Sequence, residues 1–371
     1  MLCTRGPIVQ VLRLAVLTAA LGVAFAGTAT AQDRPAFAPA VNRVIDDVIQ
    51  PGYAALEKAA SRQAELMGAL CSAPNAETLD AAHDGFSDLV AAWSRVEMFR
   101  FGPAREDNRF ERLFFWPDRR GRGLRQVQAL IAEEDGSALS PETLQDKSVA
   151  VQGLLALEYV LHGTGAETLL EDSGYRCRYG LAIAQAVEST ASGINAHWTA
   201  ADGFAAVMRT AGPDNTFYKS HGEAVQDFLR AASEQLQIVR DLKLGAAVGE
   251  TPGKAKPKRA PFWRSDLTLA SIAVNLDAVD TLFADGGIDA LLPANVVRWS
   301  EMRSFELAQA RRVIAQLGET GEPWTVLASE TEPHGRLVYA QIPLESAIRV
   351  VSERYPGALG LILGFNSLDG D

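Results

Sequence analysis

A single carboxylate, Glu158, interrupts the most apolar run of this chain, and it constrains the fold more than any other feature. From Val149 to Leu161 the sequence is apolar almost all the way round a helix, which predicts an inner helix. A Ser-Pro pair predicts that this helix begins at Ser140, and a glycine predicts that it ends at Gly163. A buried ionised carboxylate costs free energy unless it is paired, hydrogen-bonded or bound to a metal. Groups from elsewhere in the chain are therefore expected to converge on Glu158.

The first 31 residues have the pattern of a cleaved signal peptide. Two arginines precede the apolar run Leu14–Ala26, and an Ala-Thr-Ala segment then predicts cleavage before Gln32. The apolar run is too short to favour a membrane span, so no transmembrane segment is expected in the mature chain. Cys3 lies before the run and is not placed for a lipid anchor. The sequence therefore predicts a soluble periplasmic protein that is not a lipoprotein.

The charge of the chain limits its partners. Removal of a leader that holds two arginines and no acidic residue changes the net charge from −11 to −13. An acidic protein is a poor partner for nucleic acid or anionic lipid, so neither is expected. Cationic ligands, metal ions among them, remain compatible with this charge.

The mature chain keeps two cysteines, Cys71 and Cys177. In an oxidising compartment this number predicts one disulfide between them. The alternative, a thiol redox pair, favours a Cys-x-x-Cys spacing that the sequence does not contain.

Hydrophobic periodicity predicts an all-α protein with four long helices in each half, a layout that suits two four-helix bundles. The N-terminal bundle would span residues 32–209 and the C-terminal bundle residues 215–371, with a turn-forming boundary at 210–215. Residues 102–123 and 245–261 are predicted as loops, and segments 326–333 and 336–343 as a small hairpin at most. The predicted helices are Val41–Leu70, Ala76–Phe101, Leu124–Ala132, Ser140–Gly163, Tyr175–Asp202, Tyr218–Leu242, Trp263–Phe283, Val296–Leu317 and Pro343–Arg354.

The segment QGLLALEYVLHG, residues 152–163, resembles the signature helix of the imelysin family of bacterial envelope proteins. That family's motif is Gly-x-His-x-x-Glu, which places Gly153 and Glu158 on its glycine and glutamate. Leu155 stands where the family has histidine, and leucine can neither bind a metal nor transfer a proton. The sequence is thus similar to the branch of the family that lacks the motif histidine.

Other segments resemble the same branch in the same order: AAWSRVEMFRFGP, RLFFWPDRRGRG, YRCRYG, FWRSDLTLASIAVNLDAV and LGLILGFNSLDGD. The resemblance covers essentially the whole mature chain. It implies two helical bundles with a functional site between them, a link to iron uptake, and partners among the iron-uptake proteins of the envelope.

Two groups of residues are candidates for the site around Gly153 and Glu158. Glu158 is either a ligand for a metal or cationic group, or a structural partner of an arginine such as Arg100 or Arg264. Trp93, Glu97 and Arg100 share one helical face at i, i+4 and i+7. Glu97 and Arg100 either pair with each other or point toward Glu158.

Three further residues have two interpretations each. His162 lies four residues after Glu158, where it can complete a metal site or interact with the helix dipole as a cation. Trp116 and Trp263 lie in aromatic loops that also hold arginine and aspartate. They either line a cleft or cap the core.

Catalysis is disfavoured by what the sequence lacks. It contains no His-Glu-x-x-His zinc motif and no Gly-x-Ser-x-Gly nucleophile turn, and its five histidines are scattered. We therefore expect a non-catalytic binding or accessory protein in iron acquisition, with an envelope peptidase of the imelysin type as the alternative. If iron or another divalent metal binds without the histidine, its ligands should be carboxylates, first Glu158 and Glu97.

Overall fold

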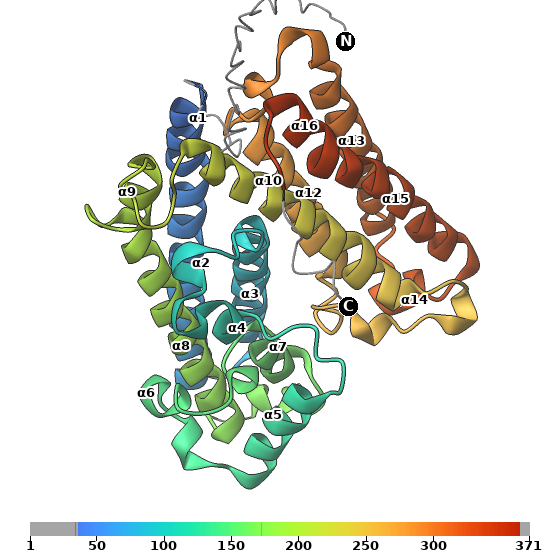
Figure 1. The fold of residues 1–371 in the computed structure, drawn as a ribbon. Helices are drawn as coiled ribbons and strands as arrows, with labels where there is room; N and C mark the ends of the chain where they lie inside the picture. The colour runs from blue at the N-terminus through green and yellow to red at the C-terminus, as the bar shows by residue number, and fades with distance from the viewer. Residues whose placement is uncertain (1–33, 35, 172, 364–371) are drawn as a thin grey trace, which may run out of the picture. The chain divides into compact units, whose positions relative to one another are not determined.

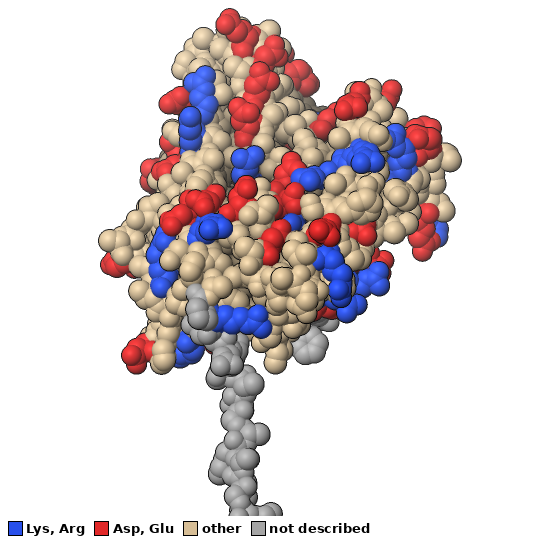
Figure 2. Space-filling view, turned by 90° about the horizontal axis from the view of Figure 1, so that it is seen from above, with Lys and Arg blue, Asp and Glu red and all other residues tan. Residues whose placement is uncertain are grey.

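The computed structural model describes residues 34, 36–171 and 173–363 of the 371-residue chain. The predicted signal peptide lies outside these residues. Every regular element within them is a helix, which confirms the all-α prediction. No helix in this part of the chain is long and apolar enough to cross a membrane. On the face drawn in Figure 2, basic and acidic side chains are interspersed.

In the first half of the chain, α2 packs against both α3 and α8 (Figure 1). Shorter helices follow α3 and cover one end of these three. The bounds are α1 Phe37–Arg43, α2 Gln50–Ser72, α3 Ala76–Val96, α4 Arg109–Leu113, α5 Arg122–Glu133, α6 Pro141–Leu144, α7 Leu154–His162, α8 Tyr175–Thr199 and α9 Phe204–Arg209. The 3-10 turns here are Gly102–Ala104, Glu106–Asn108, Gly136–Ala138, Val149–Val151 and Ala166–Leu170, and the π-helix Val44–Ile49 joins α1 to α2.

In the second half, α13 packs against α15, and α12 contacts both α13 and α3. The α3–α12 contact joins the two halves (Figure 1). The bounds are α10 His221–Gln237, α11 Ala246–Val248, α12 Thr268–Ala284, α13 Arg298–Gly318, α14 Trp324–Leu327, α15 Thr331–Arg349 and α16 Tyr355–Leu359. The π-helices are Ile238–Gly245 and Val350–Arg354, and the 3-10 turns are Pro252–Lys254, Pro257–Arg259, Asp289–Leu291 and Ala294–Val296. The division into two bundles at residues 210–215 stays a prediction.

The predicted helix from Ser140 to Gly163 is broken in the structure. It consists of α6, a 3-10 turn and α7, and only α7 carries Glu158. Helix α6 ends at Leu144, and the Ser148 hydroxyl then accepts a hydrogen bond from the backbone amide of Ala150, which caps the start of the 3-10 turn. Gly153 then has an extended backbone and serves as the N-cap of α7. Local side-chain capping therefore outweighs the continuous apolar pattern.

Other boundaries also differ from the prediction, and the helix predicted from Trp263 begins only at Thr268. Helix α3 ends at Val96 rather than at Phe101, and residues 109–113 of the predicted loop form α4. The segments predicted as a hairpin lie in or beside α15 instead. The buried positions Leu337, Ala340, Leu344 and Ala347 in α15 follow a spacing of three and four residues, so the helical period explains this difference.

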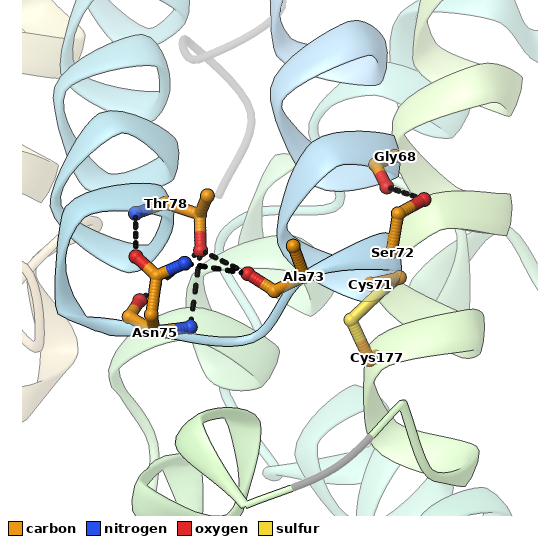
Figure 3. The surroundings of a disulfide bond; sticks show 7 residues. All are labelled: Gly68, Cys71, Ser72, Ala73, Asn75, Thr78 and Cys177. Atoms are coloured by element: carbon orange, nitrogen blue, oxygen red, sulfur yellow. Dashed lines mark hydrogen bonds between the residues drawn. A yellow bond between two sulfur atoms is a disulfide. The ribbon is translucent and has the colours of Figure 1, made fainter.

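The predicted disulfide is present (Figure 3). It joins Cys71 at the end of α2 to Cys177 at the start of α8, with their Cα atoms 5.6 Å apart. Beside it, the side chain of Asn75 accepts a hydrogen bond from the amide of Thr78 at 3.0 Å, and the hydroxyl of Thr78 accepts one from the amide of Asn75 at 3.2 Å. This reciprocal capping starts α3 immediately after the cross-linked end of α2.

Candidate functional site

A cavity of about 550 Å³ is lined by residues from both halves of the chain. The first half contributes the segment after α4 together with parts of α5 and α7. The second half contributes the segment before α12 and two residues near α11. The lining consists of Trp116, Pro117, Asp118, Arg119, Gly121, Gly123, Leu124, Val127, Ala150, Leu155, Ala156, Glu158, Tyr159, Leu242, Ala246, Lys258, Arg259, Ala260, Pro261, Phe262, Trp263 and Arg264.

Helix α7 directs one face toward this cavity. Leu155, Glu158 and Tyr159 all line it, as expected for positions i, i+3 and i+4 of a helix. The helix is held close to the end of α4 at Gly153. A Cβ atom built on Gly153 would lie 2.4 Å from the carbonyl oxygens of both Arg112 and Leu113, so only glycine fits there. The motif glycine thus sets the position of the helix that presents Glu158.

The two carboxylate oxygens of Glu158 have different surroundings. Its Oε1 accepts hydrogen bonds from the backbone amides of Arg264 and Ser265 at 2.9 and 3.1 Å, and from the Ser265 hydroxyl at 3.1 Å. Its Oε2 is buried and lies 3.9 Å from the Arg264 guanidinium, with no hydrogen-bond partner among the described residues. Burial raises the pKa of Glu158, while Arg264 and the hydrogen bonds oppose this shift. The protein therefore satisfies Oε1, whereas Oε2 is buried without a hydrogen-bond partner among the described residues.

Aromatic and cationic side chains line the cavity beside Glu158. The Trp263 ring lies 4.4 Å from the guanidinium carbon of Arg264 and 5.0 Å from the Lys258 ammonium, both within the range of cation–π attraction. The Trp116 indole donates a hydrogen bond to the carbonyl of Arg259 at 3.0 Å. This bond links the loop of the first half to the loop of the second. Trp116, Trp263 and Arg264 therefore line the same cavity as Glu158.

Glu97 lies in a different environment. It forms an ion pair with Lys243 at 2.7 Å, and both side chains are fully buried. The Lys243 ammonium also donates to Asn275 at 2.6 Å and to Ser271 at 3.2 Å, and the Asn275 amide donates to Glu97 at 3.1 Å. Burial lowers the pKa of Lys243, and Glu97 opposes that shift. The network joins the end of α3 to the second half of the chain, and Glu97 does not line the Glu158 cavity.

The remaining candidates on the α3 segment also lie away from Glu158. Trp93 is buried in the core, with its ring 5.1 Å from Phe110 and 5.6 Å from Phe114. Arg100 lies 3.6 Å from Glu97 and 4.4 Å from the Phe110 ring, and it lines a second cavity of about 530 Å³. Because α3 ends at Val96, the predicted helical face does not extend to Arg100.

His162 does not line the Glu158 cavity. Its ring stacks on His83 at 4.2 Å and tilts against Phe86 at 5.7 Å. Burial, with a smaller contribution from His83, lowers the pKa of His162 from 6.5 to about 4. Within residues 34, 36–171 and 173–363, no group of three or more His, Cys, Asp or Glu side chains is placed to hold a metal ion. The three predicted metal ligands thus have separate surroundings.

The lowered pKa of His162 gives a pH-dependent prediction. Between pH 6.5 and about 4 the unfolded chain holds a proton on this imidazole and the folded chain does not, so stability falls as pH falls through this window. The contribution is roughly 1–2 kcal/mol, discounted because the ring is partly exposed. Urea unfolding at pH 7 and pH 4.5 should show a smaller loss for His162→Phe than for wild type. Equal losses in the two proteins would contradict the assignment.

Sequence reasoning missed several residues of these two sites. Leu236, Val239 and Lys243 occupy positions i, i+3 and i+7 of one buried helical face. A lysine on such a face indicates a buried partner of opposite charge. Ser265, Lys258 and Arg259 lie in loops, where periodicity offers no comparable signal. Only the structure shows that Ser265 hydrogen-bonds to Glu158 and that Lys258 and Arg259 line the same cavity.

The comparisons with known proteins agree with this fold. The Imelysin family model matches residues 49–324. An imelysin-like protein from Psychrobacter arcticum superposes with a TM-score of 0.72 at 21% identity, covering 89% of this chain and 97% of that one. A putative iron-regulated protein A precursor from Parabacteroides distasonis superposes with a TM-score of 0.69 at 16% identity, covering 86% and 95%. No curated protein matches the chain. The family match spans well over half of the sequence, and the chain belongs to the imelysin family.

Proposed function

We propose that this chain is a periplasmic binding or accessory protein of iron acquisition, which holds its ligand in the Glu158 cavity without catalysing a reaction. Three observations support the proposal. The first 31 residues have a signal-peptide pattern, and the Cys71–Cys177 disulfide suits an oxidising compartment. One structural relative is described as iron-regulated. Partners among the iron-uptake proteins of the envelope follow from the same proposal.

The open oxygen of Glu158 is the observation that carries this proposal. A buried carboxylate oxygen without a hydrogen-bond partner among the described residues costs free energy unless a ligand completes it. The neighbouring Leu155 also lines the cavity and offers no group for acid–base chemistry or metal binding. Binding therefore fits this site better than peptide hydrolysis.

A metal ion at this site would have Glu158 as its one open protein oxygen. Glu97 is committed to Lys243, and His162 stacks on His83. The guanidinium of Arg264 also lies 3.9 Å from the open oxygen, which disfavours a bare cation. Iron, or another divalent metal, would therefore be held mainly by atoms of an accompanying chelator.

Calorimetric titration with iron salts, zinc salts and haem tests the proposal. We expect at least one iron-containing ligand to bind wild type and to bind Glu158→Gln at least tenfold more weakly, since the charged acceptor is lost. Absence of binding to both proteins, with Glu158→Gln only less stable, would make Glu158 a structural residue and contradict the proposal. Peptide cleavage that is lost in Glu158→Gln would favour the peptidase alternative.

A further inference from the structure

The charge around the cavity is opposite to the charge of the whole protein. Four cationic side chains line it: Arg119, Lys258, Arg259 and Arg264. The first three of these residues are exposed and lie at the entrance, whereas Arg264 is largely buried beside Glu158. The chain as a whole has a net charge of −11. Such a local excess of positive charge attracts an anion.

Only one of the two acidic residues of the lining is available to oppose this field. Both oxygens of Asp118 accept hydrogen bonds from backbone amides at the start of α5, at 2.8 Å from Arg122, 2.9 Å from Gly123 and 3.4 Å from Leu124. Asp118 is therefore a helix cap, and its charge is compensated by these amides and the helix N-terminus. Among the described residues that line the cavity, Glu158 is then the one carboxylate with an oxygen that lacks a hydrogen-bond partner.

The walls of the cavity suit a flat ring. Trp116, Tyr159 and Trp263 line it together with aliphatic residues such as Leu155. Aromatic side chains favour stacking with other rings, and guanidinium and ammonium groups favour ring faces. Lys258 and Arg264 already lie against Trp263 at 5.0 and 4.4 Å, so a ligand ring would enter an existing arrangement of this kind.

The unpartnered Oε2 of Glu158 limits which chemical group of a ligand can lie next to it. The amides of Arg264 and Ser265 donate to Oε1 and favour the ionised form of Glu158. An ionised carboxylate oxygen only accepts hydrogen bonds, so a ligand group that meets Oε2 must donate one. A phenolic hydroxyl satisfies this requirement without adding a charge. The anionic group of the ligand would then lie toward the cationic entrance.

We propose that the Glu158 cavity takes an aromatic anion that carries a hydroxyl donor, either free or as an iron chelate in which one hydroxyl stays protonated. This inference rests on the binding function proposed above and specifies the ligand class. It also accounts for the absence of a ready-made metal site in the described residues, since the ligand would bring the iron already coordinated.

Titration of the purified protein with 2,3-dihydroxybenzoate, followed by tryptophan fluorescence, tests the ligand class. One arm uses the free acid. The other uses its ferric complex, prepared so that the carboxylate and the 2-hydroxyl oxygen hold the iron and the 3-hydroxyl stays protonated, which separates the two sources of the same donor. Benzoate lacks the hydroxyl donors and catechol lacks the carboxylate. Each should bind about tenfold more weakly than 2,3-dihydroxybenzoate, because each loses one class of charged contact.

Variants at the entrance provide the matched comparison. Lys258→Gln combined with Arg259→Gln should weaken binding by about tenfold at low ionic strength, and by less in high salt. Lys254→Gln combined with Lys256→Gln removes the same charge from exposed positions of the same loop that do not line the cavity. This control pair should bind as wild type does.

The inference is overturned if neither form of the ligand binds, or if the entrance variant and the control pair bind equally. If iron salts or haem still bind in a Glu158-dependent way, the proposed function stands and only the ligand class is wrong. Binding of the free acid without binding of the ferric complex would support the ligand class and remove the role in iron acquisition.

Discussion

Lys243→Met should lower the free energy of unfolding by about 3–5 kcal/mol, the range expected when one partner of a buried ion pair is removed. Both Lys243 and Glu97 are fully buried, and their charged atoms lie 2.7 Å apart. The variant keeps the length of the side chain but leaves the buried Glu97 carboxylate with only Arg100, at 3.6 Å, as a cationic neighbour. Asn275 alone would then hydrogen-bond to Glu97. Urea unfolding monitored by circular dichroism measures the effect.

Two controls separate the lost charge from lost packing. Lys243→Met combined with Glu97→Gln removes both charges and should recover part of the stability, because no uncompensated ion remains. Arg62→Met breaks the exposed pair with Glu65, whose side chains are 62% and 66% exposed, and should cost less than about 1 kcal/mol. A Lys243→Met protein that loses no more stability than Arg62→Met would refute the account of this interface.

Gly153→Ala should destabilise the protein by about 3 kcal/mol, at the upper end of the effect of inserting a methyl group into a packed site. The added Cβ atom would lie 2.4 Å from two backbone carbonyl oxygens, and backbone cannot move aside as a flexible side chain does. Helix α7 would have to shift away from α4, and Glu158 would shift with it. Chemical denaturation gives the stability, and the Glu158-dependent ligand titration reports the shift of the site.

Gly335→Ala is the matched control for this substitution. Gly335 lies inside α15, and a Cβ atom built on it meets nothing within 4 Å. Alanine at this position should stabilise the protein by about 0.5–1 kcal/mol through its higher helix propensity. Equal effects of the two substitutions would show that the close approach at Gly153 is not what requires glycine.

Local patterns predicted the elements that carry the candidate site. The apolar run around Glu158 identified an inner helix, and the structure places Glu158 there with Arg264, one of the two arginines considered, beside it. The cysteine count identified the disulfide. These features depend on one segment or on a very small number of residues, so the sequence constrains them strongly.

Partners distant in the sequence were not predictable in the same way. Ser265 and Lys243 meet Glu158 and Glu97 across 107 and 146 residues. Periodicity shows which face of a segment is buried but not which segment lies opposite. For this reason Glu97 and Glu158 were paired as metal ligands from sequence, whereas the structure gives each its own cationic partner.

The proposed binding function depends on the cavity that Leu155 lines, and a variant that blocks this cavity tests the function most directly. Leu155 lines the cavity and is partly exposed to it, so Leu155→Trp should fill space without breaking the core. The measurement is a calorimetric titration of wild type and Leu155→Trp with the ferric 2,3-dihydroxybenzoate complex. The two proteins are first shown to unfold at the same urea concentration, so that a loss of binding does not reflect a loss of folding. We predict binding to wild type and a loss of at least tenfold in the filled variant. Equal affinity in the two proteins would place the ligand elsewhere and contradict the assignment of this cavity as the binding site.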